Sequence, residues 1–180
     1  MFESIGQPLD GVHLLKPTVF VDNRGDFVKT FHKTSFNNLG LHFEPVEEFF
    51  STSLKNVIRG FHFQSPPDAH DKLVYCVKGK VLDVILDLRK GSDTYGKAIG
   101  VELSAQNKYL LYIPVGFGHG FLSLEDDSVM IYKTSTMHAP QNDFGIKWDS
   151  VDFDWGNVDP IVSKRDDSFI TFNNFKSPFN

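Results

Sequence analysis

The chain has 180 residues and a formal net charge of −5, from 18 Lys and Arg against 23 Asp and Glu. This length fits one domain, taken here as residues 1–180. Apolar residues make up 41% of the chain, which excludes a disordered protein. The sequence lacks the cluster of Lys and Arg residues that nucleic-acid binding requires. The longest apolar stretch, 109–115, is too short to span a membrane. With no export signal visible, we expect a cytoplasmic protein.

Short extended segments follow one another along the chain, separated by turns rich in glycine, proline, asparagine and aspartate. Helix is expected to be minor, at 34–39 and in part of the tail. Many short strands with frequent turns are typical of a β-sandwich or barrel. The expected strands are 18–21, 27–31, 46–52, 57–64, 73–77, 81–88, 98–103, 109–113, 119–124 and 128–134.

The segment 81–89 has two distinct faces. Its even positions are all apolar, whereas its odd positions include Asp83, Asp87 and Arg89. Because side chains alternate along a strand, one face is expected in the core and the other to be polar. The two aspartates then either line a polar barrel or pair with Arg89.

The strand 57–64 places a histidine near two permanent cations, Arg59 and Lys72. Strict alternation puts His62 and Arg59 on opposite faces, so Arg59 is either a surface residue or a buried anion clamp. Nearby positive charge favours a neutral imidazole, which is the form that a general base must have. A core histidine hydrogen-bonded to backbone is the alternative.

A proline and three glycines in 113–121 constrain a tight turn that presents His119. The pattern Pro114-x-Gly116-x-x-His119 resembles the second conserved motif of the cupin superfamily, whose members are jelly-roll barrels. Metal-binding cupins add two histidines and a glutamate from a first motif, but only His62 occupies that motif here. A catalytic divalent metal needs three or four ligands. The resemblance therefore implies an all-β cupin jelly-roll barrel with few short helices and no metal.

A closer resemblance covers residues 18–167, where several long motifs occur in the order and spacing of the dTDP-4-dehydrorhamnose 3,5-epimerase family. These motifs are Asp22-x-Arg24-Gly25-x-Phe27, Arg59-Gly60-Phe61-His62-Phe63-Gln64, Lys72-Leu73-Val74, Gly79-x-Val81-x-Asp83-Val84, Asp87-x-Arg89-x-Gly91-Ser92, Leu103-Ser104-x-x-Asn107, Ile113-Pro114-x-Gly116-Phe117-x-His119, Tyr132-Lys133 and Gly145-Ile146-x-Trp148.

This resemblance implies an isomerase that acts on a nucleotide-linked 4-keto-6-deoxy sugar in rhamnose-type or capsule polysaccharide biosynthesis. The C4 ketone acidifies the hydrogens on C3 and C5, so epimerisation needs a base, an enolate stabiliser and an acid on the opposite face. By similarity, His62 is the base and Asp166 orients it. Tyr132 is the acid and Lys72 stabilises the enolate, without a cofactor.

The resemblance also implies residues that bind the nucleotide-diphosphate sugar. Arg24 and Arg59 would contact the diphosphate and nucleotide, because the arginine fork matches phosphate oxygens, and His119 would lie in the same pocket. Phe20 would reach the pocket of a neighbour in a homodimer formed through exchanged edge strands at 18–31. The Phe-rich tail beyond Asp167 is expected to pack against the barrel.

The sequence departs from the family pattern at positions that recognise the nucleotide and sugar. Glu47 and Phe49 replace a Gln and an Asn of the family motif that ends in Ser51 and Ser53, and Lys29 replaces a Glu. His138 stands where a tyrosine stacks on thymine, and Asp143 replaces a glutamate.

Because a carboxylate can accept both N–H donors of guanine, one hypothesis is a GDP-linked 4-keto sugar, including a 6-deoxyheptose, in place of the dTDP-linked one. Four functional alternatives remain at this stage: a sugar-nucleotide 3,4-ketoisomerase, a C3-only epimerase, a metal-dependent cupin and a non-catalytic sugar-binding cupin.

Overall fold

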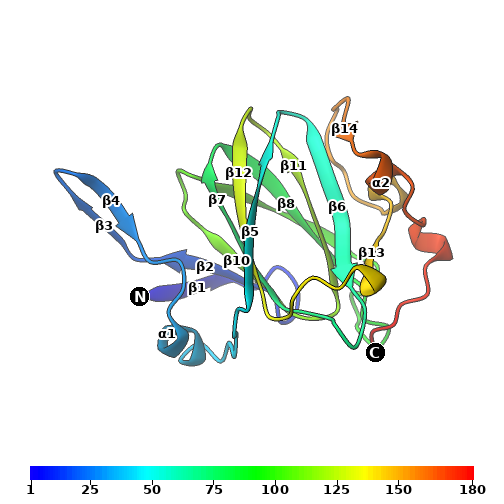
Figure 1. The fold of residues 1–180 in the computed structure, drawn as a ribbon, viewed down its shortest axis with the longest axis horizontal. Helices are drawn as coiled ribbons and strands as arrows, with labels where there is room; N and C mark the ends of the chain where they lie inside the picture. Colours follow the sequence, from blue (N-terminus) through cyan, green and yellow to red (C-terminus); the bar gives the residue numbers. More distant parts are fainter.

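The computed structural model describes all residues 1–180 and consists mainly of two facing β-sheets (Figure 1). The first sheet contains, in spatial order, β1 (Phe2–Gly6), β2 (His13–Pro17), β10 (Leu110–Ile113), β7 (Lys72–Lys78), β12 (Ser128–Thr134) and β5 (Glu47–Ser53). The second contains β13 (Asp143–Gly145), β6 (Val57–Gln64), β11 (Phe117–Ser123), β8 (Lys80–Asp87) and β9 (Ala98–Ser104), with β14 (Ile161–Val162) parallel to β6.

The eight strands from β5 to β12 form the jelly roll that the sequence predicted. If they are counted as 1 to 8 along the chain, one sheet has the order 1-8-3-6 and the other has the order 2-7-4-5. This is the double Greek key of a jelly roll, and its ladders are antiparallel. The expected all-β fold is therefore confirmed.

Helical structure is limited to short pieces. These are α1 (Lys33–Asn37), α2 (Lys164–Asp167) and the 3-10 turns η1 (Pro140–Asn142), η2 (Trp148–Ser150) and η3 (Phe172–Asn174). None of these helices is long and apolar enough to cross a membrane.

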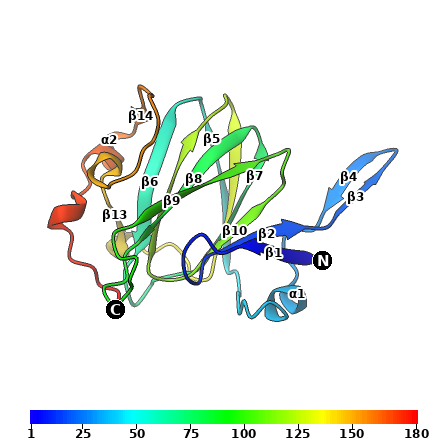
Figure 2. The same ribbon diagram turned by 180° about the vertical axis from the view of Figure 1, so that it is seen from behind.

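A separate hairpin, β3 (Val19–Asp22) and β4 (Gly25–Val28), projects from the barrel beside β1 and β2 (Figure 2). Its strands make no ladder with either sheet. The expected strand at 27–31 ends early, at Val28.

Both sheets are covered on their outer faces as well as packed against each other. The core between the sheets includes Val74, Ile85 and Met130. The N-terminal segment around α1 packs Phe36 and Phe43 on the outer face of the first sheet. The C-terminal segment packs Trp155 and Phe179 on the outer face of the second sheet, so the Phe-rich tail lies against the barrel as expected.

The two faces of β8 are both buried, which corrects the expectation of a core face and a polar face. Val84 and Leu86 on the even face pack under the C-terminal segment, whereas the odd face points between the sheets. Asp83 and Asp87 on that odd face are fully buried. Asp87 binds the guanidinium of Arg89 at 2.8 Å, which is one of the two roles considered for these aspartates, whereas Asp83 pairs with His119 and does not line the cavity.

The alternation expected for β6 is wrong between Arg59 and His62, because the strand has an extra residue there. His119 pairs with His62 and Phe121 pairs with Arg59, so three steps along β6 match two along β11. An irregularity of this kind turns the following side chains to the other face. Arg59 and His62 therefore line the same cavity.

Gly60 makes this irregularity feasible. Its φ is +113°, and a Cβ atom there would lie 2.6 Å from both the Cα of Gly120 and the carbonyl oxygen of His119. Only glycine fits such a close backbone approach at positive φ.

Four strands were not expected from the sequence: β1, β2, β13 and β14. β13 and β14 have three and two residues, and each is defined by its pairing with β6 and not by a local pattern. β2 ends in Pro17, a residue that argues against a central strand when only the sequence is read.

Candidate active site

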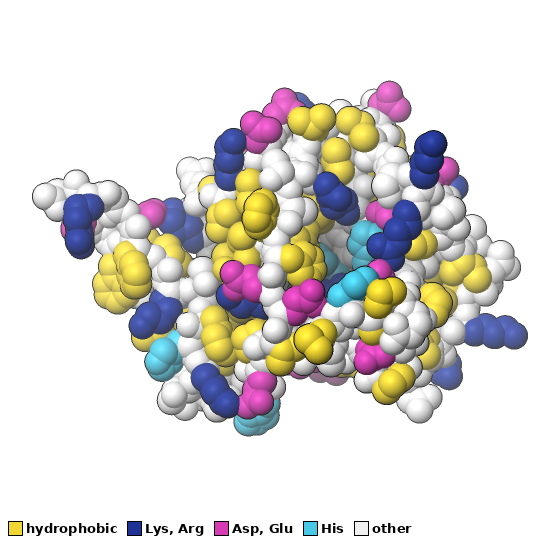
Figure 3. Space-filling model, in the orientation of Figure 1, with side chains coloured by type: hydrophobic (Ala, Val, Ile, Leu, Met, Phe, Trp, Pro, Cys, Tyr) yellow, Lys and Arg dark blue, Asp and Glu magenta, His cyan; other side chains and the backbone are white.

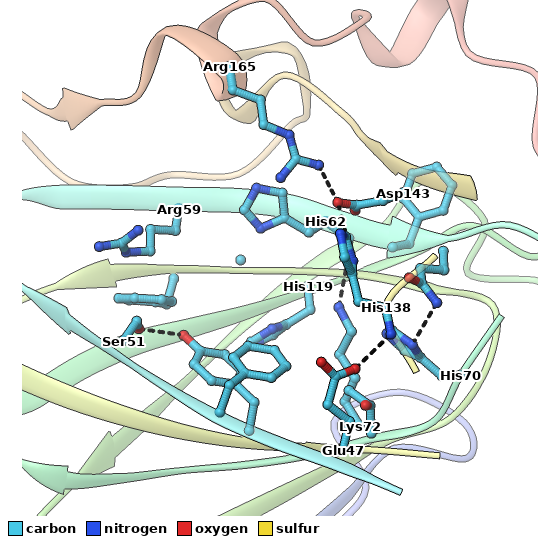
Figure 4. Close-up of a pocket in the computed structure, with 17 residues that line it drawn as sticks. Glu47, Ser51, Arg59, His62, His70, Lys72, His119, His138, Asp143 and Arg165 are labelled. Atoms are coloured by element: carbon cyan, nitrogen blue, oxygen red, sulfur yellow. Dashed lines mark hydrogen bonds and ion pairs between the residues drawn. The ribbon is translucent and has the colours of Figure 1, made fainter. Parts of the chain in front are cut away.

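One cavity of about 450 Å³ opens between the two sheets (Figure 3). Its walls come from β5, β12 and β7 of the first sheet and from β6 and β11 of the second, with additional side chains from the segments that carry η1, β13 and α2. The lining residues are Glu47, Phe49, Ser51, Arg59, His62, Phe63, Gln64, His70, Lys72, His119, Gly120, Phe121, Tyr132, Thr134, His138, Asp143 and Arg165 (Figure 4).

A histidine–aspartate pair forms one wall of this cavity. Nε2 of His62 lies 3.0 Å from Oδ1 of Asp166, and the other carboxylate oxygen accepts the backbone N–H of Gly60 at 2.9 Å. Asp166 is buried in α2, where Ser163 caps the helix by accepting the N–H of Asp166. The short helix therefore fixes the carboxylate behind the imidazole.

The geometry of this pair defines the state of the imidazole. An ionised carboxylate only accepts hydrogen bonds, so Nε2 carries the proton and Nδ1 keeps its lone pair. Burial lowers the pKa of His62, and the nearby cations Lys72 and Arg165 lower it further, against the opposing effect of Asp166. The imidazole is therefore neutral at neutral pH and can accept a proton.

Asp166 remains ionised beside it. Burial alone would raise the pKa of Asp166, but the hydrogen bonds from His62 and Gly60 outweigh that effect and hold the pKa below its ordinary value. A stable negative charge next to Nε2 stabilises the imidazolium that forms when Nδ1 takes a proton.

Tyr132 stands on the opposite sheet, in β12, and its side chain is buried. Its phenol shares a hydrogen bond of 3.0 Å with the hydroxyl of Ser51 on β5, and its ring stacks on Phe49 with centroids 4.8 Å apart. Burial raises the pKa of Tyr132. The phenol is therefore protonated at neutral pH and can donate a proton into the cavity.

Lys72 begins β7 and reaches across to the other sheet. Its Nζ donates to the carbonyl oxygen of His62 at 3.0 Å. Burial lowers the pKa of Lys72 to about 8, although Asp143 and Asp83 pull it upward. The side chain is a cation at neutral pH, held close to the imidazole by its own hydrogen bond.

Below these groups lies a second buried pair. Nε2 of His119 donates to Oδ2 of Asp83 at 2.8 Å, and Oδ1 of Asp83 has no hydrogen-bond partner. His119 is the cross-strand neighbour of His62 in the β11–β6 ladder, and its ring centroid lies 6.1 Å from that of Tyr132.

Two arginines place positive charge at the cavity. Arg59 is held by Ser53 Oγ at 3.1 Å and by the carbonyl oxygen of Thr52 at 3.1 Å, and Arg165 binds Asp143 at 2.7 Å. A planar guanidinium in a cavity wall is suited to bind phosphate oxygens.

The acidic and imidazole groups expected to recognise the nucleotide lie near one another (Figure 4). Glu47 accepts the backbone N–H of His138 at 2.7 Å, which links β5 to the segment before η1. Nδ1 of His138 lies 3.9 Å from Asp143.

The structure brings together most of the residues that the sequence pointed to. Nine line the cavity and Asp166 contacts one of them, whereas Arg24 and Phe20 lie outside. Phe20 is 58% exposed on the projecting hairpin, and Arg24 pairs there with Asp22 at 2.5 Å. The nine are His62, Tyr132, Lys72, Arg59, His119, Glu47, Ser51, His138 and Asp143.

Sequence reasoning missed Arg165 and His70. Arg165 directly precedes Asp166, so the short helix α2 carries both to the site. The neighbouring Asp166 was the only feature of the sequence that pointed to Arg165. Nδ1 of His70 accepts from Gln64 at 3.2 Å. Burial and the nearby Lys72 lower the pKa of His70 to about 3, so it is neutral. Nothing in the local sequence distinguished His70 from a loop histidine.

These groups define a class of protein. A neutral imidazole backed by a carboxylate, a protonated phenol on the opposite sheet and a cation in the same cavity can remove a proton from one face of a carbon and return one to the other. The structure contains no group of three or more His, Cys, Asp or Glu arranged to hold a metal ion. The fold and the site are those of a jelly-roll enzyme for acid–base chemistry at carbon.

Comparisons with known proteins make the assignment specific. The sequence model of dTDP-4-dehydrorhamnose 3,5-epimerase matches residues 6–174. The dTDP-4-dehydrorhamnose 3,5-epimerase of Methanothermobacter thermautotrophicus is 41% identical over 170 residues, which cover 92% of this chain and 91% of that protein. The chain belongs to the dTDP-4-dehydrorhamnose 3,5-epimerase family.

Two solved structures show the same fold at high similarity. The dTDP-6-deoxy-D-glucose-3,5-epimerase of Legionella pneumophila, in complex with dTDP-4-keto-L-rhamnose, superposes with a TM-score of 0.91 at 32% identity and covers 98% of this chain and 95% of its own. A 3'-monoepimerase of Streptomyces bikiniensis, in complex with dTDP-quinovose, superposes with a TM-score of 0.86 at 30% identity and covers 92% and 87%. The prediction of an isomerase for a nucleotide-linked 4-keto sugar is confirmed at the level of the family.

Proposed function

We propose that this chain inverts C3 and C5 of a nucleoside diphosphate-linked 4-keto-6-deoxy sugar. One observation carries the proposal: His62, backed by Asp166, and the phenol of Tyr132 enter the same cavity from opposite sheets, and Lys72 lines that cavity beside His62. Nδ1 of His62 removes the proton next to the ketone, and the ammonium of Lys72 stabilises the enolate oxygen. Tyr132 then donates a proton to the other face. The phenolate recovers a proton from solvent and the imidazolium releases one to solvent, which resets both groups.

Deuterium exchange tests these roles face by face. In D2O, the native enzyme should incorporate deuterium at C3 and C5 of dTDP-4-keto-6-deoxyglucose and form the inverted sugar. His62→Asn should reduce both exchange and inversion by roughly 100- to 10,000-fold, because a positioned base contributes about that much.

The Tyr132→Phe variant separates the two proton transfers. His62 can still remove and return a proton on its own face, so exchange at carbon should persist while inversion is lost. Inversion at the native rate without Tyr132 would reject the phenol as the acid. Deuterium at C3 alone in the native enzyme would indicate a C3-only epimerase.

The nucleotide is a second part of the proposal. The Legionella pneumophila and Streptomyces bikiniensis epimerases carry dTDP-linked sugars, which favours thymidine. Glu47, however, places a carboxylate in the cavity, and a carboxylate can accept the adjacent N–H donors of guanine, although one of its oxygens already accepts the N–H of His138. Exchange measured with dTDP-linked and GDP-linked 4-keto sugars side by side decides between them, and exchange with the dTDP compound alone rejects guanine.

We also propose a homodimer in which the β3–β4 hairpin completes the neighbour's site. This is supported by the exposure of Phe20 and Phe27 on a hairpin that projects from its own barrel, and by the fact that Arg24 does not line its own cavity. The expected cytoplasmic location remains a prediction, which cell fractionation would test.

A further inference from the structure

The C-terminal tail places an aromatic ring against the proposed base. After α2 ends at Asp167, the chain turns so that the N–H of Phe169 donates to the carbonyl oxygen of Asp166 at 3.3 Å. The ring of Phe169 then meets the imidazole of His62 edge to face, with centroids 5.5 Å apart and an interplanar angle of 83°. Phe169 does not line the cavity, so it contacts the imidazole from outside the substrate space.

Gly145 provides the space for this ring. A Cβ atom at Gly145 would lie 2.2 Å from the ring of Phe169. The φ angle of Gly145 is not in the left-handed region. Alanine would therefore suit the backbone of β13, and only the ring excludes it. Gly145 is also the cross-strand partner of His62, so the ring and the imidazole share one small enclosure.

A third contact with the ring comes from Arg165. The guanidinium carbon of Arg165 lies 5.3 Å from the ring centroid of Phe169, within the range of a cation–π interaction. Phe169 is thus fixed by the tail backbone, by the gap at Gly145 and by Arg165.

We propose that Phe169 is a positioning residue for His62: its ring fixes the plane of the imidazole and keeps water from the side that faces away from substrate. The inference rests on the proposed function, because it requires His62 to be the base. A single hydrogen bond to Asp166 does not fix the plane of the imidazole. Catalytic side chains need packing as well as hydrogen bonds to hold their geometry. Gly145 and Phe169 act together: the absence of a side chain at Gly145 leaves a space beside the imidazole, and the ring of Phe169 fills it.

Three charged groups act on the titration of the imidazole: Asp166 and Arg165 of α2 and Lys72 of β7. Asp143 of β13 and His119 of β11 line the same cavity. None of them is substituted in the variants below, and Arg165 keeps its ion pair with Asp143. A change in titration therefore reports on water and packing at the ring and on the Arg165 contact that the ring holds.

The first test follows the imidazole directly by NMR, without substrate. In Phe169→Ala, water should reach the imidazole and stabilise its charged form, so the midpoint of the His62 titration should move to higher pH. Phe172→Ala is the matched control, because Phe172 is a partly buried ring of the same tail that packs on Tyr95 and Gly96 instead. An unmoved His62 titration in Phe169→Ala, or an equal movement in Phe172→Ala, would overturn the proposal.

The second test uses the coupling between Gly145 and Phe169. Gly145→Ala alone should displace the ring and raise the midpoint of the His62 titration, as Phe169→Ala does. In the Phe169→Ala background the clash no longer exists, so adding Gly145→Ala should change nothing further. Additive effects of the two substitutions would show that Gly145 acts by another route and would contradict the shared enclosure.

The third test is kinetic and uses dTDP-4-keto-6-deoxyglucose. Phe169→Ala should lower kcat by roughly 10- to 100-fold, as expected for a misplaced base, while KM changes by less than about threefold. Phe169→Leu should recover part of the rate because it refills the space. A native kcat in Phe169→Ala would reject the inference. Absence of turnover by the native enzyme would reject the proposed function instead, and the NMR titration would still test the contact.

Discussion

At the scale of single residues, the lowered pKa of Lys72 affects both the stability of the protein and the pH range in which the site can work. Its amine is buried, donates to the carbonyl oxygen of His62 and has a pKa of about 8 because burial disfavours the charge. The imidazole it helps to keep neutral has a lowered pKa as well. The site therefore combines a neutral base and a cation only within a window of pH.

We expect this window to appear in the pH profile of kcat. The rate should fall as pH rises through about 8, because a neutral amine no longer stabilises the enolate. It should fall on the acid side only below the ordinary histidine range, because the pKa of His62 is lowered. Lys72→Met should lose roughly 100- to 1,000-fold in kcat and lose the basic limb. Lys80→Met, at a lysine outside the cavity, should keep that limb, and a basic limb that survives in Lys72→Met would contradict the assignment.

The same burial predicts a cost in stability. Between pH 8 and 10.5 the unfolded chain holds a proton on Lys72 that the folded chain has released. Stability from this group therefore rises with pH across that window, and the cost is fully present below it. Lys72→Met should raise the free energy of unfolding at pH 7 by roughly 1–3 kcal/mol, measured by urea denaturation. A Lys72→Met variant that is less stable than the native protein would contradict this prediction, because it would show that interactions in the folded state outweigh the cost of burying the ammonium.

At the scale of elements, the irregular pairing of β6 with β11 decides which side chains share the cavity. Gly60 lies against Gly120 and the carbonyl of His119, and its N–H binds Asp166. One glycine thus permits the close approach of two strands and supports the carboxylate of the site.

Substitution of Gly60 should therefore be costly. Gly60→Ala introduces a Cβ at positive φ and 2.6 Å from backbone, so we expect a loss of roughly 3 kcal/mol or more in the free energy of unfolding. Gly91→Ala is the control, because nothing lies within 4 Å of its ideal Cβ and its φ is not left-handed. That variant should stay within about 1 kcal/mol of the native protein in urea denaturation. Equal stability of the two variants would refute the argument.

At the scale of the whole molecule, the β3–β4 hairpin forms no ladder with either sheet of the barrel. Val21 is 76% exposed and Phe27 is 60% exposed, on strands that pair only with each other. Isolated two-stranded hairpins are marginal in water, and exposed apolar patches commonly mark an interface.

The proposed homodimer gives this hairpin a partner. Light scattering should find twice the chain mass of 20.4 kDa for the native protein. The double variant Phe20→Ser/Phe27→Ser should shift the protein to the monomer, with loss of activity because Arg24 no longer reaches the neighbour. Phe144→Ser removes an exposed ring outside the hairpin and should remain a dimer. A native protein that is monomeric at micromolar concentration would refute the proposal.

Local pattern predicted the strands that carry strong alternation or long apolar runs, such as β6, β8 and β12, because that information lies within a few residues. The site residues followed from long motifs around His62, Lys72 and His119. Arg165 and His70 escaped notice because their roles depend on neighbours distant in sequence: Asp143 for one, and Thr136 for the other.

The sequence by itself determined an all-β barrel and the types of side chain that perform acid–base chemistry, since strand periodicity and motif order are local properties. Only the tertiary structure decided that Arg59 and His62 face one cavity, that both faces of β8 are buried, and that Phe169 lies against the imidazole. Each of these depends on cross-strand register or on where the C-terminal tail packs. Such contacts join residues far apart in the chain, and their geometry is fixed by the packing of the whole barrel.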